Sequence, residues 1–386
     1  MTRNYALRIL VVFLVLFIAY LLIAHFVLEP LGYYGTAEQP RFADPWIPRA
    51  ETIVGGGLLY RDVYTTTPPL INFLLIPPAL VSGLFNHRNP WATLSFMTYF
   101  SFFNLFAAYA LLYMEKDRRE GYHSALYFLL NPLTFGNSLL RRQDEPILVF
   151  FFSLALLFLL HRQHWKASVA VGLTLLVKLS GALMIPIAFL HTRDWRCLII
   201  PPIALVLIFA PFLIAAGQSA GFWNVTRTAT QHPFELDGIS LGVLWARAHE
   251  GESPVSLTVY SAILVIGVAI VLVLIAWKPL GILEDLTLLT TTVLLLAPKL
   301  HCGYLSLLVL MMAPLLRPYR IAALHFLFGL LALIADMYKW PVKNYAVAFG
   351  LMVGVFLILS TTMVWLRWSR RTQNGTPVPR TAVEKK

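Results

Sequence analysis

Charged residues are scarce in this chain of 386 residues. They make up 13% of the sequence against 58% hydrophobic residues, and the mean hydropathy is +0.71. A soluble protein of this length could not solvate its surface with so few charges. The composition therefore excludes a soluble globular class and indicates a polytopic helical membrane protein. The net charge of +11 is dispersed in short clusters between apolar runs, which is typical of topology determinants and excludes nucleic acid as a partner.

Cysteines are also few, and the sequence shows no cleavable signal peptide. Only Cys197 and Cys302 are present, and the topology described below puts them at opposite membrane faces, which excludes a disulfide between them. The first apolar run is long for a signal peptide, and no A-x-A site follows it. The sequence predicts an uncleaved first span.

Long apolar runs are what the chain has instead. A helix needs about 20 apolar residues to cross the hydrocarbon layer, and we predict an all-α membrane bundle of about twelve spans (11–13). The expected ranges are 8–28, 93–114, 121–139, 146–160, 167–178, 180–192, 197–216, 256–276, 281–297, 303–316, 321–336 and 345–366. The fifth and sixth are short enough to be one broken helix. Residues 70–85 are interrupted by Pro77-Pro78, and we expect an interfacial helix there.

Basic residues determine the orientation. With the N-terminus inside, the inner loops, the tail, Arg3 and Arg8 hold 18 of the 30 Lys and Arg residues, as the positive-inside rule requires. This arrangement predicts a single membrane domain over 1–366 in the cell membrane, with both termini in the cytoplasm. It gives two long outer loops, 29–92 and 217–254, and a disordered basic cytoplasmic tail over 367–386.

Unusual polar residues fall on the outer side, which predicts that the active site lies there. Asp44 stands between Phe-Ala and Pro-Trp, where a carboxylate could take a proton from an alcohol. An equally weighted interpretation is that Asp44 caps an interfacial helix beginning at Pro45.

A second group of charges occurs further along the chain. Arg141-Arg142 with Asp144-Glu145 reads either as a surface salt-bridge patch or as a phosphate site. Lys178 interrupts an apolar run of some twenty residues; it either snorkels to the interface or faces a cavity, where it would suit a lipid phosphate.

The stretch "PKLHCGY" adds Lys299, His301 and Tyr304 near the same level, although each could merely anchor a helix end. No zinc or calcium ligand spacing is present, so we predict no metal site and no cofactor.

Four passages follow one another along the chain: "GGGLLYRDVYTTTPPL" after the early Asp44, "NPLTFGNSLLRRQDEPILVFFFSLALLFL", "VAVGLTLLVKLSGALMIPIAFL" and "LLLAPKLHCGYLSLLVLMMAPLL". In this order they resemble the GT-C class of membrane glycosyltransferases, which use polyprenyl-phosphate sugars. The last is similar to a late P-x-x-H-x-x-Y passage of mannosyltransferase-like branches. The resemblance covers about residues 8–316.

The resemblance implies an inverting hexosyltransferase with a mannose-like sugar. The donor would be a polyprenyl-phosphate sugar, and the acceptor a hydroxyl of a glycan, lipid or protein. Asp44 would be the catalytic base, and Asp62, Asp144 and Glu145 would orient the acceptor or the sugar. Binding of the donor phosphate would fall to Arg141, Arg142, Lys178, His301 and Tyr304. No tight Asp-x-Asp is formed by Glu51 and Asp62, so no divalent metal is expected.

Other classes remain as alternatives. A multispan transporter or flippase shares the span number, but the long first outer loop and the lack of related halves count against it. A lipid-linked oligosaccharide polymerase or ligase should have its largest loop late in the chain. A non-catalytic scaffold has no positive feature in its favour.

Overall fold

The protein is helical throughout the part of the chain that the structure describes. A computed structural model describes residues 2–34, 46–63, 65, 67–84, 90–217, 238–249, 256–298, 300–316 and 322–375. Within these ranges no strand forms, and only an isolated bridge joins Leu59 and Val63. The helices are α1 Thr2–Ile23, η1 Ala24–Leu28, α2 Trp46–Val54, α3 Pro69–Leu74, α4 Ile76–Ser82, α5 Pro90–Met114, α6 Arg118–Leu130, α7 Pro132–Phe135, η2 Gly136–Leu140, α8 Glu145–Leu160, α9 His164–Val177, η3 Leu179–Leu183, α10 Met184–Thr192, α11 Arg196–Ala216, α13 Leu241–Ala248, α14 Leu257–Trp277, α15 Ile282–Leu296, η5 Cys302–Tyr304, α16 Leu305–Leu316, α17 Ala322–Lys339 and α18 Tyr345–Gly375.

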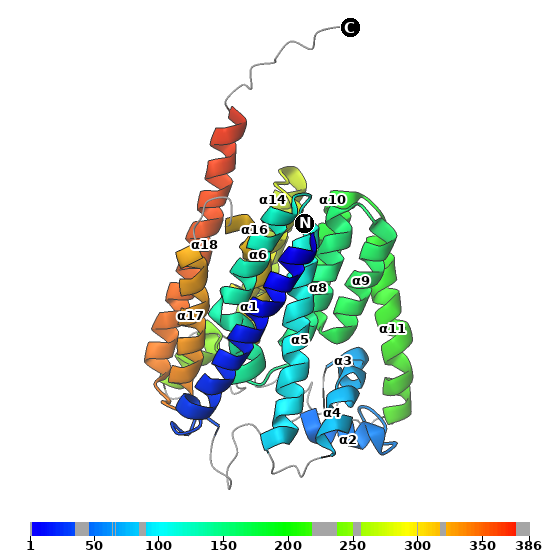
Figure 1. Cartoon of the computed structure of the whole chain (residues 1–386). Helices are drawn as coiled ribbons and strands as arrows, with labels where there is room; N and C mark the ends of the chain where they lie inside the picture. Colours follow the sequence, from blue (N-terminus) through cyan, green and yellow to red (C-terminus); the bar gives the residue numbers. More distant parts are fainter. Residues whose placement is uncertain are drawn as a thin grey trace.

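The long helices pack side by side into one bundle (Figure 1). Each of the twelve predicted ranges contains a helix. Six helices in the described ranges are long and apolar enough to cross a membrane, namely those at 4–28, 93–114, 196–216, 258–277, 322–339 and 345–366. The multispan helical class is therefore confirmed, and the number of crossings stays a prediction.

The predicted fifth and sixth spans are two antiparallel helices. The chain leaves α9 at Lys178, whose backbone is extended (φ −150°, ψ 142°). It folds back so closely that a Cβ on Gly181 would lie 2.6 Å from the backbone of Thr174. At the other end, His164 at the start of α9 lies 3.7 Å from Asp194, just after α10. The interpretation as one broken helix is wrong because the chain reverses direction here.

The short basic turns gather at one end of the bundle. The segments 114–117, 160–161 and 281–284 line a common cavity of about 590 Å³. His161 also contacts the carbonyl of Tyr113, with 2.9 Å between Nε2 and O. Figure 1 has the start of α1 and the end of α18 at one end of the bundle and α2, α3 and α4 at the opposite end.

The first long loop carries short helices, as predicted. Pro68 precedes α3, where Pro69 occupies the first turn and needs no hydrogen-bond donor. Leu75 then separates α3 from α4, whose first turn contains Pro77 and Pro78. The predicted interfacial helix over 70–85 is thus two short helices with a bend between them.

The C-terminal segment differs from the prediction of a disordered tail from residue 367. Helix α18 continues to Gly375 because neither proline nor glycine occurs between 367 and 374. Residues 376–386 lie outside the described residues.

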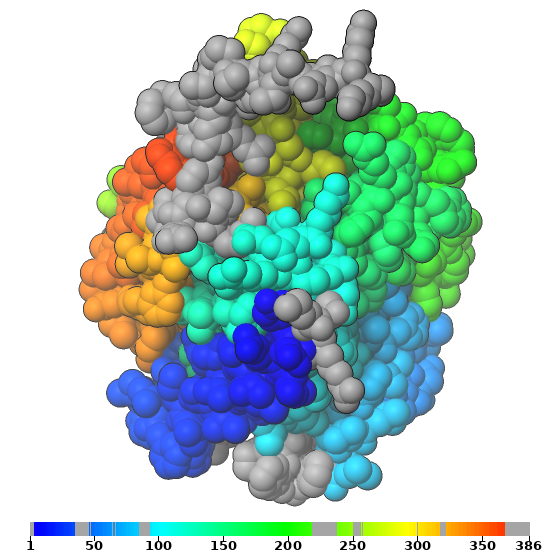
Figure 2. All heavy atoms as spheres, turned by 45° about the horizontal axis from the view of Figure 1, so that its top comes forward, coloured from blue at the N-terminus to red at the C-terminus, as the bar shows by residue number. Residues whose placement is uncertain are grey.

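One apolar core runs through the bundle. It includes fully buried Phe100, Phe128, Phe135, Phe152 and Phe328. Both cysteines are buried and unbridged, as predicted. Figure 2 looks towards the end where α1 begins; α17 and α18 (orange) and α9 to α11 (green) lie on opposite sides, with α5 and α6 (cyan) between them.

Candidate active site

A buried ion cluster lies at the end of the bundle that carries α2 to α4. The Lys178 ammonium lies 2.7 Å from Asp144 Oδ1 and donates a 2.8 Å hydrogen bond to Glu145 Oε1. The three residues are at most 8% exposed. The extended backbone at the end of α9 directs Lys178 into the bundle, where it is buried, so the snorkelling interpretation is wrong. That Lys178 faces a cavity suited to a lipid phosphate stays a prediction. The 141–145 stretch is likewise buried at Arg141, Asp144 and Glu145, which excludes a simple surface patch.

Charge in this cluster is only partly balanced. One ammonium serves two carboxylates, and Asp144 Oδ2 and Glu145 Oε2 receive no hydrogen bond from the described residues. Burial raises the pKa of the Asp144 carboxyl above its ordinary value, and Lys178 opposes this only in part. Carboxylate oxygens held in a dry setting without donors are suited to bind hydroxyl groups.

The turn before α16 closes one side of the cluster. Lys178 Nζ lies 5.4 Å from the centre of the Tyr304 ring, a cation–π contact. The His301 ring is 6.3 Å from the Tyr304 ring. Gly303 packs so tightly against Glu145 that a Cβ there would overlap its carboxylate. Tyr304 therefore lies beside the cluster and His301 lies next to Tyr304, near the same level as the sequence predicted. Lys299 lies outside the described residues.

Arg141 forms an ion pair with Asp336, a residue that the sequence analysis did not single out. Its Nε donates to Asp336 Oδ2 at 2.9 Å and its Nη1 to Asn137 Oδ1 at 3.1 Å. Asp336 also accepts from the Tyr33 hydroxyl at 3.2 Å and lies 3.7 Å from the Lys339 ammonium. An Asp and a Lys three residues apart in the apolar run 322–339 were the available signal, because such charges are costly unless paired.

Arg142 points elsewhere, because its backbone is left-handed (φ +53°). Its guanidinium lies 3.9 Å from the centre of the Tyr34 ring, and its carbonyl accepts a 3.0 Å hydrogen bond from Trp46 Nε1. It makes no ion pair with a described residue, and its Nε has no hydrogen-bond partner there. The residues on both sides of 35–45 thus contact Arg142. Asp44, the predicted base, lies outside the described residues.

Arg49 on α2 is a further cation near the cluster. It lies over the Trp46 ring at 5.2 Å, one helical turn away, and donates to Thr67 Oγ1 at 3.4 Å. Burial lowers the pKa of its guanidinium, and the nearby Asp144 carboxylate opposes this shift. No feature of the sequence marked Arg49 as a candidate site residue.

Asp62 is not part of the cluster. Its carboxylate is exposed and accepts hydrogen bonds from Arg61 and from the Leu58 amide at 2.8 Å. The Arg61 hydrogen bond, followed by the Leu58 amide, lowers the pKa of Asp62. The adjacent Tyr60 stacks on Phe209 of α11, with 5.0 Å between ring centres, and fixes this loop against the bundle.

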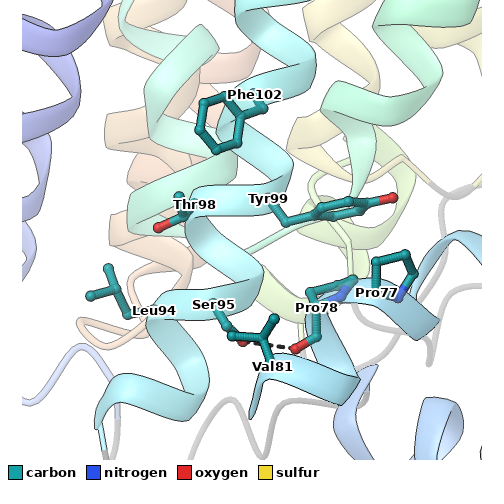
Figure 3. A pocket seen from close by; sticks show the side chains of 8 residues that line it. All are labelled: Pro77, Pro78, Val81, Leu94, Ser95, Thr98, Tyr99 and Phe102. Carbon is teal, nitrogen blue, oxygen red and sulfur yellow. Dashed lines mark hydrogen bonds between the residues drawn. The ribbon is translucent and has the colours of Figure 1, made fainter.

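Two of the apolar cavities formed by the described residues bear on this site. One, of about 440 Å³, runs between η3, α10, α14 and α15 and reaches Ser180 and Tyr304, beside Lys178. The other, of about 400 Å³, lies between α4 and α5 (Figure 3); Pro77, Pro78 and Tyr99 line it, and Ser95 donates to the Pro78 carbonyl at 3.0 Å. The Pro77-Pro78 stretch therefore walls a cavity, but of these two cavities it is the first that adjoins the ion cluster.

No group of three His, Cys, Asp or Glu side chains in the described ranges is arranged to hold a metal ion. The cluster instead holds one cation between two carboxylates, with Arg49 nearby, an arrangement able to bind hydroxyl groups and to accept a proton from one of them.

Comparison with solved structures assigns the architecture. The chain superposes on the crystal structure of ArnT from Cupriavidus metallidurans with a TM-score of 0.51 and 14% sequence identity, over 94% of this chain and 78% of that one. The fold is GT-C-like, as the four sequence passages indicated. No curated protein gives a significant sequence match.

The family assignment comes from the sequence itself. Residues 64–298 match the model of glycosyltransferase family 87. This range covers more than half of the chain, so the protein belongs to glycosyltransferase family 87, and it is a membrane glycosyltransferase.

Proposed function

We propose that the protein moves a hexose, mannose-like, from a polyprenyl-phosphate donor to a hydroxyl acceptor at the outer membrane face. The main observation in support is that the buried ion cluster adjoins an apolar cavity. Tyr304 lines this cavity, and the centre of its ring lies 5.4 Å from Lys178 Nζ. A ligand that fills both must be an amphiphile with a polar head, and the arginines described below favour an anionic one. A polyprenyl-phosphate sugar has this form.

The cations support a phosphate leaving group. Arg141 is neutralised by Asp336, whereas Arg142 and Arg49 form no ion pair with a described residue. We therefore assign the phosphate chiefly to Arg142 and Arg49. Lys178, whose charge is already shared by Asp144 and Glu145, would contact it from the edge, with His301 and Tyr304. Guanidinium groups match phosphate oxygens through paired N–H donors. The ArnT structure with the similar fold holds undecaprenyl phosphate.

The reaction is a single displacement with inversion. A carboxylate takes the proton of the acceptor hydroxyl, and the hydroxyl oxygen forms a bond to C1 of the sugar. The bond between C1 and the phosphate oxygen breaks, and its electron pair moves to the phosphate. Cations that stabilise this developing charge lower the barrier, and the base raises the nucleophilicity of the hydroxyl. We assign the base to Asp44, because Trp46, two residues later, is hydrogen-bonded to Arg142 beside the cluster. Asp144 and Glu145 would orient the sugar or the acceptor.

The orientation follows from charge. The basic turns 115–121, 161–166 and 277–281 favour the cytoplasmic side, and the cavity they share lies away from the ion cluster. The cluster, at the α2–α4 end, would then face the outer compartment, with both termini in the cytoplasm.

Turnover of purified protein with defined donors tests this proposal. We expect sugar transfer from undecaprenyl-phosphate mannose to a hydroxyl acceptor such as an alkyl mannoside, seen as a mass increase of one hexose, and none from GDP-mannose. Arg49→Gln should raise the donor KM about tenfold or more, since a hydrogen bond to a charged group contributes about 1.5–3 kcal/mol.

Arg61→Gln is the matched control, because Arg61 lies at the same end but its one ion pair with a described residue is with exposed Asp62. Transfer from GDP-mannose alone, or equal effects of the two substitutions, would contradict the proposal.

A further inference from the structure

Asp336 connects a distant helix to the ion cluster. It is 1% exposed, lies on α17, and is 195 residues from its partner Arg141 in the chain. Two guanidinium nitrogens of Arg141 contact its carboxylate, Nε at 2.9 Å and Nη2 at 3.5 Å. Asp336 also lies outside the range that matches the family model.

Two side chains hold the Arg141 guanidinium, and each has a further partner of its own. Asp336 holds one edge of the guanidinium, and Asn137 on η2 accepts from Nη1. Asn137 in turn donates to Ser306 at the start of α16. Tyr33 donates to the same Asp336 carboxylate that binds Arg141. A side chain held in this way has little rotational freedom, so its charge stays at one point in the bundle.

That point lies near the Glu145 carboxylate of the ion cluster. Arg141 is four residues from Glu145, and it is one of the positive groups whose field reaches the Glu145 carboxylate, together with Lys178 and His301. The positive charge of Arg141 helps to stabilise the Glu145 carboxylate, because the single Lys178 ammonium is paired with both Glu145 and Asp144. If Arg141 moved, Glu145 would draw Lys178 away from Asp144.

We propose that Asp336 is a positioning residue for glycosyl transfer: it fixes Arg141 so that Lys178 stays shared between Asp144 and Glu145. The inference rests on the site proposed above. It separates Arg141, which organises the cluster, from Arg142 and Arg49, which meet the donor.

A matched pair of isosteric substitutions tests the proposal. Asp336→Asn removes the charge and keeps the shape. Asp285→Asn is the control, because Asp285 is also 1% exposed and pairs with a basic side chain, His191, at 2.8 Å, but belongs to the end of the bundle with the basic turns. Both should lower the unfolding temperature, since each removes the anion of a buried pair.

The kinetic effects should differ. For Asp336→Asn we expect kcat to fall tenfold or more with the donor KM within about threefold, because a misplaced group affects the transition state more than ground-state binding. Asp336→Glu, which restores the charge, should recover part of the loss. Asp285→Asn should leave both constants within about twofold. Equal kinetic effects of Asp336→Asn and Asp285→Asn would overturn the proposal.

A thermodynamic cycle provides a readout that does not depend on the donor. Glu145→Gln is combined with Asp336→Asn and, separately, with Asp285→Asn, and the unfolding midpoints are compared. Coupling through Arg141 predicts a non-additive shift for the first combination and an additive one for the second. Additive shifts in both would overturn the proposal. The two proposals can fail separately. If the donor class were wrong, the unmodified protein would show no turnover with that donor, but the non-additive shift of Glu145→Gln with Asp336→Asn would remain.

Discussion

Gly303→Ala is the smallest change that should disturb the candidate site. The new methyl group would overlap the carboxylate of Glu145. Glu145 cannot simply swing aside, because it is 2% exposed and bonded to Lys178 at 2.8 Å. Either the hydrogen bond to Lys178 breaks or the 302–304 turn shifts away from α8.

The magnitude follows from these two responses. Overpacking a dense core costs about 1–3 kcal/mol, and losing a hydrogen bond to a charged group costs about 1.5–3 kcal/mol. Together they predict a destabilisation of about 2.5–6 kcal/mol if both occur. The turnover number should fall with it, because Glu145 and Lys178 change position together.

The assay is thermal unfolding in detergent, with turnover measured on the folded fraction. Gly350→Ala is the matched control, because a Cβ at Gly350 on α18 has nothing within 4 Å, and alanine favours a helix over glycine by about 1 kcal/mol. The control should be neutral or slightly stabilising. Equal midpoints and equal turnover for the two variants would refute the claim that Gly303 fixes the position of Glu145.

Three further predictions concern the base, the shared cation and metal ions. Asp44→Asn should abolish sugar transfer without reducing expression, and unchanged transfer would remove Asp44 as the base. Lys178→Met should destabilise the fold by about 3–5 kcal/mol, because it leaves two buried carboxylates without their cation; adding Glu145→Gln should recover part of this loss, and no recovery would contradict the shared ion pair. EDTA should leave turnover unchanged, and a loss restored by Mg²⁺ or Mn²⁺ would show that a divalent cation is required.

The helices were the predictable part of this molecule. Apolar runs of near-membrane length determine them through composition alone, so each of the twelve expected ranges contains a helix. Their ends were less predictable. The reversal at Lys178 depends on Gly181 packing against α9, and the pattern of apolar residues does not encode that contact.

The site was predictable where a charge interrupts an apolar run. Lys178 stood out for this reason, and Asp144 and Glu145 stood out as part of a dense charge cluster between two apolar runs; the structure brings the three together. Asp336 and Arg49 were missed, because their roles come from tertiary contacts with Arg141 and near Asp144 that no local spacing reveals. Asp62 lies outside the ion cluster, with its carboxylate bonded to its neighbours Arg61 and Leu58, so its predicted role in orienting the acceptor or the sugar stays a prediction.

The most direct measurement is the position of a bound undecaprenyl phosphate, determined by cryo-electron microscopy of the purified protein. The account predicts phosphate density within hydrogen-bond distance of Lys178, Arg142 or Arg49, with the isoprenoid tail in the cavity between α10, α14 and α15. Phosphate density at the end of the bundle where α1 begins, or a tail confined to the cavity between α4 and α5, would contradict it.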